Sequence, residues 1–149
     1  MKNEYGRRQQ ATPRWMIVDD NEEILLLMRD IAAQFSDAEI VCFNSPHAAL
    51  AAFGAAPENF ELVITDFEMP GMNGVELCHR LRAILPSVKI LLATGSGLVS
   101  AEAAANEGFC GLLHKPFPFA SLQRALAAAG LREIPAENNS KKIAALTMA

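Results

Sequence analysis

Five polar residues, each at the end of an apolar run, are the best candidates for chemistry in this sequence. They are Asp19, Asp20, Asp66, Thr94 and Lys115. If the runs before Asp20 and Asp66 form neighbouring strands, the three aspartates converge on one small patch. Two like charges about 4 Å apart cost on the order of 4 kcal/mol at an effective dielectric of about 20. A proton, a cation or a salt bridge must relieve that repulsion. A hard divalent cation suits oxygen ligands, and Lys115 can pair with whichever carboxylate faces it.

This set of residues suits phosphoryl transfer. A carboxylate is a competent nucleophile toward phosphorus and gives an aspartyl phosphate. The transfer needs mainly positioning and charge neutralisation, which a magnesium ion, a lysine and a hydroxyl provide. Asp66 is the best nucleophile candidate, because it stands alone after the central apolar run and opens a loop. Thr94 can donate a hydrogen bond to a phosphoryl oxygen, and Gly71 and Gly74 leave room for a partner's reactive group.

Helix capping is the simpler interpretation of the first acidic pair. Asp19, Asp20 or Asn21 could each cap the helix that follows, and for any one of them alone capping is favoured. Three carboxylates, a hydroxyl and a lysine at one sheet edge favour a functional site instead.

Apolar runs and amphipathic segments alternate along the chain. The predicted strands cover residues 14–18, 39–43, 60–65, 88–93 and 111–114, and the predicted helices cover 21–35, 46–53, 75–85, 99–107 and 117–129. This alternation is typical of an α/β fold with a parallel sheet and helices on both faces. In such sheets functional groups collect at the carboxyl ends of the strands, which is where the five polar residues fall.

Composition narrows the class of protein. The chain has 149 residues, of which 51% are hydrophobic and 20% charged, with a net charge of −4. That length fits one domain, and the apolar content excludes disorder. The apolar runs are far shorter than a membrane span, which needs about 20 residues, so no membrane insertion is expected. The acidic balance argues against a direct nucleic-acid partner. The three cysteines and three histidines lack zinc-ligand spacing, and unpaired cysteines indicate a cytoplasmic protein.

Four ordered motifs resemble the signature of response-regulator receiver domains of two-component signalling, of the single-domain type found in chemotaxis. They are Val18-Asp19-Asp20, the DFEMPGMNG segment at 66–74, Ala93-Thr94-Gly95 and Lys115-Pro116-Phe117. The resemblance spans residues 14–129. It implies a flavodoxin-like, doubly wound five-stranded parallel sheet with strand order 2-1-3-4-5.

The resemblance also implies a magnesium-dependent reaction. Asp66 would be the phosphoacceptor, loaded by a histidine kinase or a histidine phosphotransfer protein. Mg²⁺ would be bound by Asp66, directly by Asp20, through a water by Asp19, and by the backbone carbonyl of Glu68. By this resemblance the chain is not an enzyme, but a phosphoacceptor that assists its own phosphorylation and dephosphorylation.

Two further roles follow from the same resemblance. Thr94 would be the switch hydroxyl and Lys115 the cation that pairs with the phosphoryl group, with a cis bond between Lys115 and Pro116. Receivers often carry Tyr or Phe at the second switch position, where this sequence has Leu112, so Thr94 lacks its usual aromatic partner. Activation in the family usually remodels the face of the fourth helix, fifth strand and fifth helix, through which a homodimer is expected.

Glu68 is a second departure, because it places a fourth carboxylate beside the site. It either orients or repels an attacking water, or it points to solvent. Phosphatases with an aspartate nucleophile carry a second aspartate at this position, which disfavours a phosphatase.

The expected organisation is an N-terminal arm at 1–13, a receiver domain at 14–130, and a tail or linker at 131–149 with no output domain. In the tail, Ile143 and Leu146 follow Lys141 and Lys142, which fits either an amphipathic partner segment or a frayed end. Function is therefore expected to pass through protein contact with a downstream target. Two alternatives stay open: an interaction module that does not depend on phosphorylation, and the receiver portion of a hybrid histidine kinase.

Overall fold

A single parallel sheet organises the chain in the computed structural model, which describes residues 13–115 and 117–131. The expected arm and tail lie outside the described residues, apart from Pro13 and Leu131. The strands are β1 (Arg14–Val18), β2 (Glu39–Phe43), β3 (Phe60–Asp66), β4 (Lys89–Thr94) and β5 (Gly111–His114). They pair in the order β2-β1-β3-β4-β5, and every pairing is parallel. The predicted fold class and strand order are confirmed.

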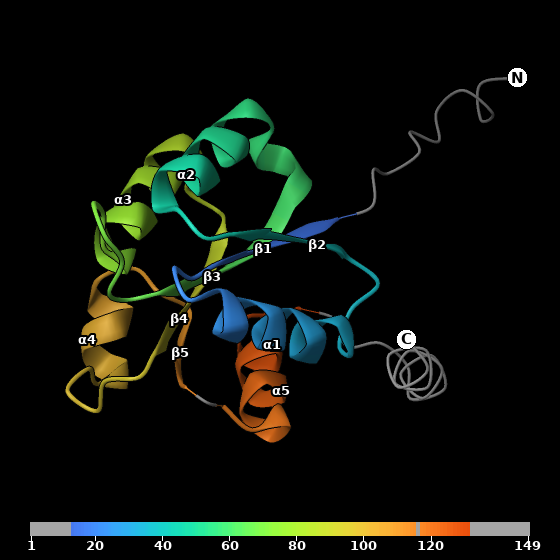
Figure 1. Cartoon of the computed structure of the whole chain (residues 1–149), viewed down its shortest axis with the longest axis vertical. Helices are drawn as coiled ribbons and strands as arrows, with labels where there is room; N and C mark the ends of the chain where they lie inside the picture. The colour runs from blue at the N-terminus through green and yellow to red at the C-terminus, as the bar shows by residue number, and fades with distance from the viewer. Residues whose placement is uncertain (1–12, 116, 132–149) are drawn as a thin grey trace, which may run out of the picture.

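Helices cover both faces of this sheet (Figure 1). They are α1 (Glu22–Ala33), α2 (Pro46–Ala55), α3 (Gly74–Ile84), α4 (Ala101–Asn106) and α5 (Phe119–Ala128). The core of one face contains residues of α2, α3 and α4, and the core of the other contains residues of α1 and α5. A short 3-10 helix at Pro57–Asn59, which was not predicted, joins α2 to β3.

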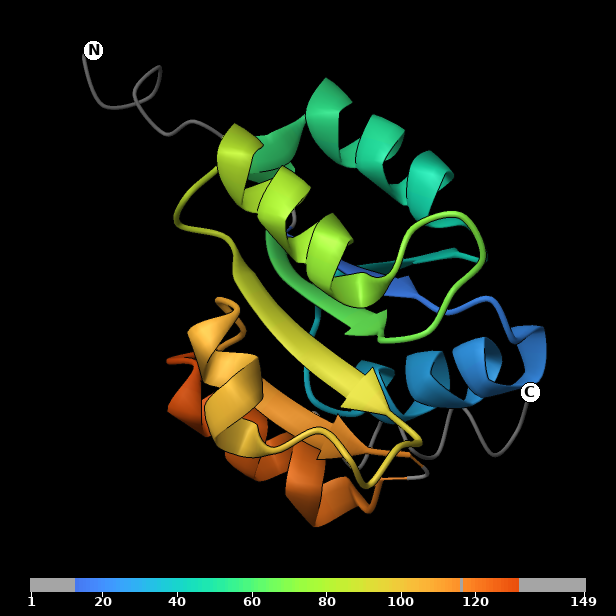
Figure 2. The ribbon, with the colours of Figure 1, turned by 90° about the vertical axis from the view of Figure 1, so that its left-hand side faces the viewer.

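The central strands are buried on both faces, and this explains their continuous apolar runs. In β3, Val63 packs into the core under α2 and α3, whereas Leu62 and Ile64 pack into the core under α1 and α5. The carboxyl ends of β3, β4 and β5 reach the same edge of the sheet (Figure 2). That edge is where the polar residues of the motifs are expected.

Three predicted helices begin later than expected. The helix predicted from residue 21 begins at Glu22, because Asn21 is its N-cap. The helix predicted from residue 99 begins at Ala101, because the Ser100 side chain accepts a hydrogen bond from the Ala103 N–H at 3.0 Å and caps it. The helix predicted from residue 117 begins at Phe119, since Pro118 is still extended.

Two strands end later than expected. β3 extends to Asp66 and β4 extends to Thr94, so both side chains stand on the last residue of a hydrogen-bonded strand. Asp66 pairs with Ala93, and Thr94 pairs with His114. The sheet therefore fixes the direction of both side chains.

The loop from β3 to α3 closes tightly on the end of β3. The Gly74 N–H donates to the Phe67 carbonyl at 2.8 Å, and a Cβ at position 74 would overlap the Asp66 carbonyl oxygen. The room that this glycine provides is thus filled by the chain's own backbone. The expectation that Gly74 makes room for a partner's reactive group is wrong.

We predict opposite effects of alanine at two helical glycines. Gly74→Ala should lower the free energy of unfolding by about 2 kcal/mol, because the new methyl overlaps the backbone of Asp66. Gly54→Ala, inside α2 and 3.8 Å from its nearest neighbour, should raise it by about 0.5–1 kcal/mol, because alanine favours helix. Urea unfolding followed by fluorescence of the single tryptophan, Trp15, measures both. Equal effects of the two substitutions would contradict the close approach at Gly74.

Candidate functional site

The structure brings the five predicted polar residues to one edge of the sheet. Asp19 follows β1, Asp66 ends β3, Thr94 ends β4, and Lys115 follows β5. Asp19, Asp66 and Thr94 are buried, whereas Asp20 is exposed. A buried polar group needs a partner, because losing water without a hydrogen bond costs about 1–3 kcal/mol.

Lys115 is the partner of two of these groups. Its ammonium nitrogen lies 2.7 Å from Asp19 Oδ2 and 3.0 Å from Asp66 Oδ1, and its side chain is only 10% exposed. These ion pairs join the ends of β1, β3 and β5, and so reach across the end of β4, which lies between β3 and β5. One lysine is therefore shared by two buried carboxylates.

This sharing leaves an excess of negative charge. Burial raises the pKa of Asp66, its hydrogen bond to Lys115 only partly offsets that effect, and the charge of Asp19 raises the pKa further. Burial alone would lower the pKa of Lys115, but its hydrogen bonds to Asp19 and Asp66 and the negative charges of both carboxylates together outweigh burial and raise that pKa. The lysine is thus held in its charged form, while the negative charge of Asp66 is not fully neutralised.

Asn21, and neither aspartate, caps the first helix. Its side-chain oxygen accepts from the Ile24 N–H at 3.1 Å. Asp19 Oδ1 accepts instead from the Asn21 N–H at 2.9 Å, which orients Asp19 Oδ2 on Lys115. The capping interpretation holds for Asn21 alone, and it leaves Asp19 and Asp20 available to the site.

Two groups that the sequence did not indicate orient Asp66. The Phe67 N–H donates to Asp66 Oδ1 at 2.8 Å, and the buried Thr65 hydroxyl donates to the Asp66 carbonyl at 3.0 Å. A backbone N–H carries no sequence signal, and a threonine inside a strand resembles an ordinary β-former. At the first residue of the loop after β3, the Phe67 N–H thus points at the Asp66 carboxylate.

Thr94 connects the site to the loop before α4. Its Oγ1 accepts from the Ser96 N–H at 3.1 Å, which leaves the hydroxyl hydrogen available for donation. Its carbonyl accepts from the Lys115 N–H at 2.8 Å. Thr94 therefore contacts both the charged residue of the site and the loop that leads to α4.

The acidic residues fit a divalent cation. Carboxylate oxygens of Asp19, Asp20 and Asp66 all lie within 4.8 Å of one another, and oxygen is the ligand type that Mg²⁺ prefers. Glu68 is exposed at the rim beside Asp20, and the ligand role of its carbonyl stays a prediction. The donor chemistry fits magnesium, and the ammonium group of Lys115 contacts two of the three carboxylates.

The remaining predicted residues lie as follows. Leu112 is half-buried and packs against the core under α2, α3 and α4. Pro116 lies outside the described residues, and so does the expected cis bond between Lys115 and Pro116. Within residues 13–115 and 117–131, no helix has the length and apolar character that a membrane crossing requires.

Removing the shared lysine should destabilise the fold in a pH-dependent way. We predict that Lys115→Met lowers the free energy of unfolding by about 3 kcal/mol at neutral pH, because two buried carboxylates lose their cation. Lys115 lowers the pKa of Asp66, so without it that pKa should rise further, and the folded variant should bind a proton at a higher pH than the folded wild type does. The deficit should therefore shrink as the pH falls through the pKa of Asp66 in the variant.

Urea unfolding in metal-free buffer at several pH values measures this deficit. Lys89→Met, at an exposed lysine that begins β4, is the matched control and should change stability by less than about 0.5 kcal/mol. A loss that is equal in the two variants, or that does not depend on pH, would contradict the charge analysis.

Known proteins resemble this chain over the same region. A response regulator receiver protein of Anaeromyxobacter is 36% identical over 104 residues, which are 69% of this chain and 42% of that protein. The C4-dicarboxylate transport transcriptional regulatory protein DctD of Rhizobium meliloti is 31% identical over 137 residues, which are 91% of this chain and 29% of that protein. The chain thus spans less than half the length of either relative.

A solved structure and a family model agree with these relatives. The response regulator TrrA of Thermotoga maritima, solved in complex with Mg(2+)-BeF, superposes with a TM-score of 0.69 at 26% identity, over 78% of this chain and 98% of that one. The family model described as the response regulator receiver domain matches residues 15–127. This chain therefore belongs to the response regulator receiver domains of two-component systems.

Proposed function

We propose that this chain is a magnesium-dependent phosphoacceptor, which takes a phosphoryl group on Asp66 and signals by protein contact. The observation that carries the proposal is the position of the Lys115 ammonium between Asp19 and Asp66 at the carboxyl edge of the sheet. It supplies a fixed positive charge next to a carboxylate that stands at the rim of a groove. A phosphoryl group attached there would extend into a pocket already equipped with a cation and a hydroxyl.

The proposed step is an in-line displacement. A carboxylate oxygen of Asp66 attacks phosphorus, an O–P bond forms, and the N–P bond of a phosphohistidine donor breaks with its electron pair on the imidazole. Bound Mg²⁺, held by Asp19, Asp20, Asp66 and the Glu68 carbonyl, would neutralise negative charge on the phosphoryl oxygens. The Phe67 N–H fixes the direction of the Asp66 carboxylate during the attack.

After transfer, two side chains are proposed to hold the phosphoryl group. Lys115, already charged and nearly buried, would exchange its contact with Asp66 for one with a phosphoryl oxygen. Thr94 would donate its hydroxyl hydrogen to another. Because Thr94 also holds the Ser96 N–H, a shift of its hydroxyl would pull on the loop before α4. This provides the route from the chemistry to the face formed by α4, β5 and α5, where we propose that a partner or a second copy binds.

The regulation of dephosphorylation is proposed to involve Glu68. Its exposed side chain lies at the rim of the groove that also contains Asp66. From that rim it can orient or repel the water that hydrolyses the aspartyl phosphate. The chain would in this sense assist its own phosphorylation and dephosphorylation without being a turnover enzyme.

The boundaries of the unit are also a proposal. We assign the receiver to residues 14–130 and the arm and tail to 1–13 and 131–149, and we propose the cytoplasm as its location. The relatives extend far beyond the matched region, so the downstream target, and a place in a hybrid histidine kinase, depend on what accompanies this domain.

A second candidate function is an interaction module that does not respond to phosphorylation. It is favoured by Leu112, which provides no aromatic ring to follow the movement of Thr94. In this alternative the fold and its partner contacts are retained, and the loop before α4 keeps one arrangement whatever the state of Asp66.

Incubation with acetyl phosphate and Mg²⁺ tests the phosphoacceptor proposal. The chain should gain the mass of one phosphoryl group, and Asp66→Asn should gain none, because the amide cannot act as the nucleophile. Asp37→Asn, at an exposed aspartate between α1 and β2, is the matched control and should be phosphorylated as the wild type is. If the wild type gains no phosphoryl group from this donor or from a cognate kinase, the proposal fails.

Hydrogen exchange distinguishes the two candidate functions. On phosphorylation, the amides of residues 98–105 should change their exchange rates, because Thr94 holds the loop that precedes them. The amides of residues 46–55 in α2 should not change, and Asp66→Asn should show no effect with the same reagents. Unchanged exchange at 98–105 in a chain that is shown to be phosphorylated would favour the phosphorylation-independent module.

A further inference from the structure

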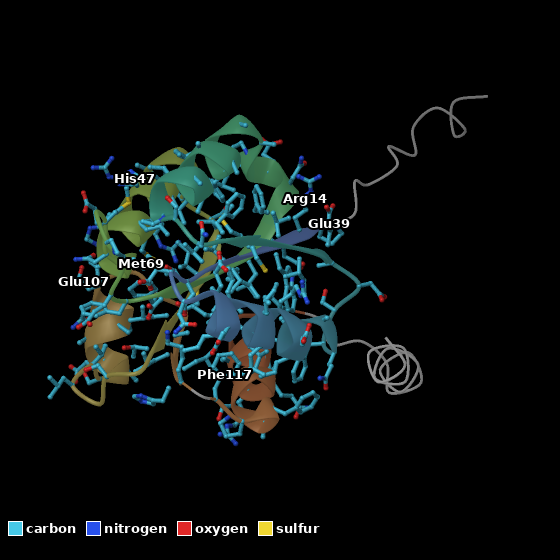
Figure 3. All side chains as sticks on the ribbon, in the orientation of Figure 1. Arg14, Glu39, His47, Met69, Glu107 and Phe117 are labelled. Carbon is cyan, nitrogen blue, oxygen red and sulfur yellow. The ribbon has the colours of Figure 1, made fainter. Side chains whose placement is uncertain are left out.

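An apolar groove lies directly beside the proposed phosphoacceptor. It has a volume of about 650 Å³. The residues of its apolar part are Ile24, Leu27, Met28 and Ile31 of α1, together with Phe117. We call this feature the α1 groove. One end of it opens onto Asp66, Glu68 and Lys115, and Phe117 lies on the α1 and α5 side of the sheet (Figure 3).

The α1 groove exposes apolar surface to water. The side chain of Leu27 is 49% exposed, although it belongs to the apolar part of the groove. A concave apolar site next to charged groups is the usual form of a binding site. The groove is therefore a surface to be covered, and its occupant must offer apolar side chains with positive charge nearby.

The chain itself contains a segment with this character. Residues 140–149, with the sequence SKKIAALTMA, contain two lysines and no acidic residue, and Ile143 and Leu146 are three positions apart in the sequence, a spacing that would place both side chains on one face if the segment were helical. The helix that forms the groove has the opposite charge, since α1 carries three acidic residues and one arginine. Apolar side chains and charge thus match between this segment, which we call the tail segment, and the α1 groove.

The described part of the chain ends on the same side of the sheet as the α1 groove. Leu131 packs against the core shared by α1 and α5, near the amino-terminal end of β3, where it shares a hollow with Phe60 and Glu61. The groove begins at the other end of β3, and a strand of that length spans roughly 20 Å. The chain from Leu131 to Ile143 can extend over about 40 Å. Ile143 can therefore reach the groove without crossing the sheet.

We propose that the tail segment docks in the α1 groove of its own chain, with Ile143 and Leu146 against Leu27. This contact does not depend on the proposed phosphoacceptor function.

Limited trypsin digestion of the full chain tests the contact. Cleavage after Lys141 and Lys142 is followed by mass spectrometry, with cleavage after Arg8 as the internal reference. Leu27→Asp should accelerate cleavage at the two lysines about tenfold, because it opens the docked state. Leu26→Asp is the matched control, since Leu26 is equally exposed at 47% but is not among the residues that line the groove, and it should leave the rate unchanged. Trp15 fluorescence checks that both variants are folded.

A complementary pair of variants alters the tail segment instead of the groove. Ile143→Asp with Leu146→Asp should speed hydrogen exchange at residues 24–31 of α1. Asn138→Asp with Asn139→Asp adds the same charge nearby and should not. If the wild-type lysines are cleaved as fast as those of Leu27→Asp, or if both tail variants behave alike at α1, the proposal is overturned.

Two further outcomes are decisive. Protection of the lysines that increases with protein concentration would mean that a second copy supplies the tail segment, which would overturn docking within one chain. Uptake of phosphate from acetyl phosphate is measured in the same samples. A failure of that uptake with protected lysines contradicts only the proposed function, whereas normal uptake with unprotected lysines contradicts only the docking.

Discussion

The sharing of one lysine by two buried carboxylates is the interaction on which the site depends. Lys115 lies within hydrogen-bonding distance of Asp19 and Asp66, and neither carboxylate could be buried so deeply without it. The three residues come from the ends of three different strands, so their meeting requires the sheet to be fully assembled. The same contact leaves the site short of positive charge, as the raised pKa of Asp66 indicates. The contact that stabilises the fold therefore also leaves negative charge that a cation would neutralise.

The parallel sheet explains why so few residues are enough. Because all five strands run in one direction, their carboxyl ends meet at one edge, and the side chains there need only short loops to complete the site. The backbone contributes as much as the side chains. The Phe67 N–H orients the Asp66 carboxylate, and the Ser96 N–H holds the Thr94 hydroxyl. The site is thus coupled to two loops, one leading to α3 and the other to α4, and these loops are the elements through which a change at Asp66 can reach the surface.

Much of the fold could be predicted from local patterns. Among the residues that the structure describes, the alternation of apolar runs with amphipathic segments located every strand and helix except the short 3-10 helix at Pro57–Asn59, and the resemblance carried by four motifs indicated the strand order. Boundaries were less accurate where a side chain decided them, as with the Ser100 cap of α4 and the extended Pro118 before α5. Gly74 was assigned the wrong purpose, because the sequence shows that a glycine is present but cannot show that the backbone of Asp66 fills the space beside it.

The sequence by itself determined which chemical groups are present and in what order they reach the edge of the sheet: two aspartates, a third aspartate, a threonine and a lysine. Residue type and hydrophobic periodicity are local properties, and they are sufficient for that much. Only the tertiary structure decided which of these groups bond to one another and which side chains face the groove. Lys115 is bonded to Asp19 and Asp66 together, and Leu27 faces a groove while Leu26 does not. Each of these outcomes depends on distances between residues far apart in the chain, or on the rotation of a helix against the sheet, and packing of the whole domain sets both.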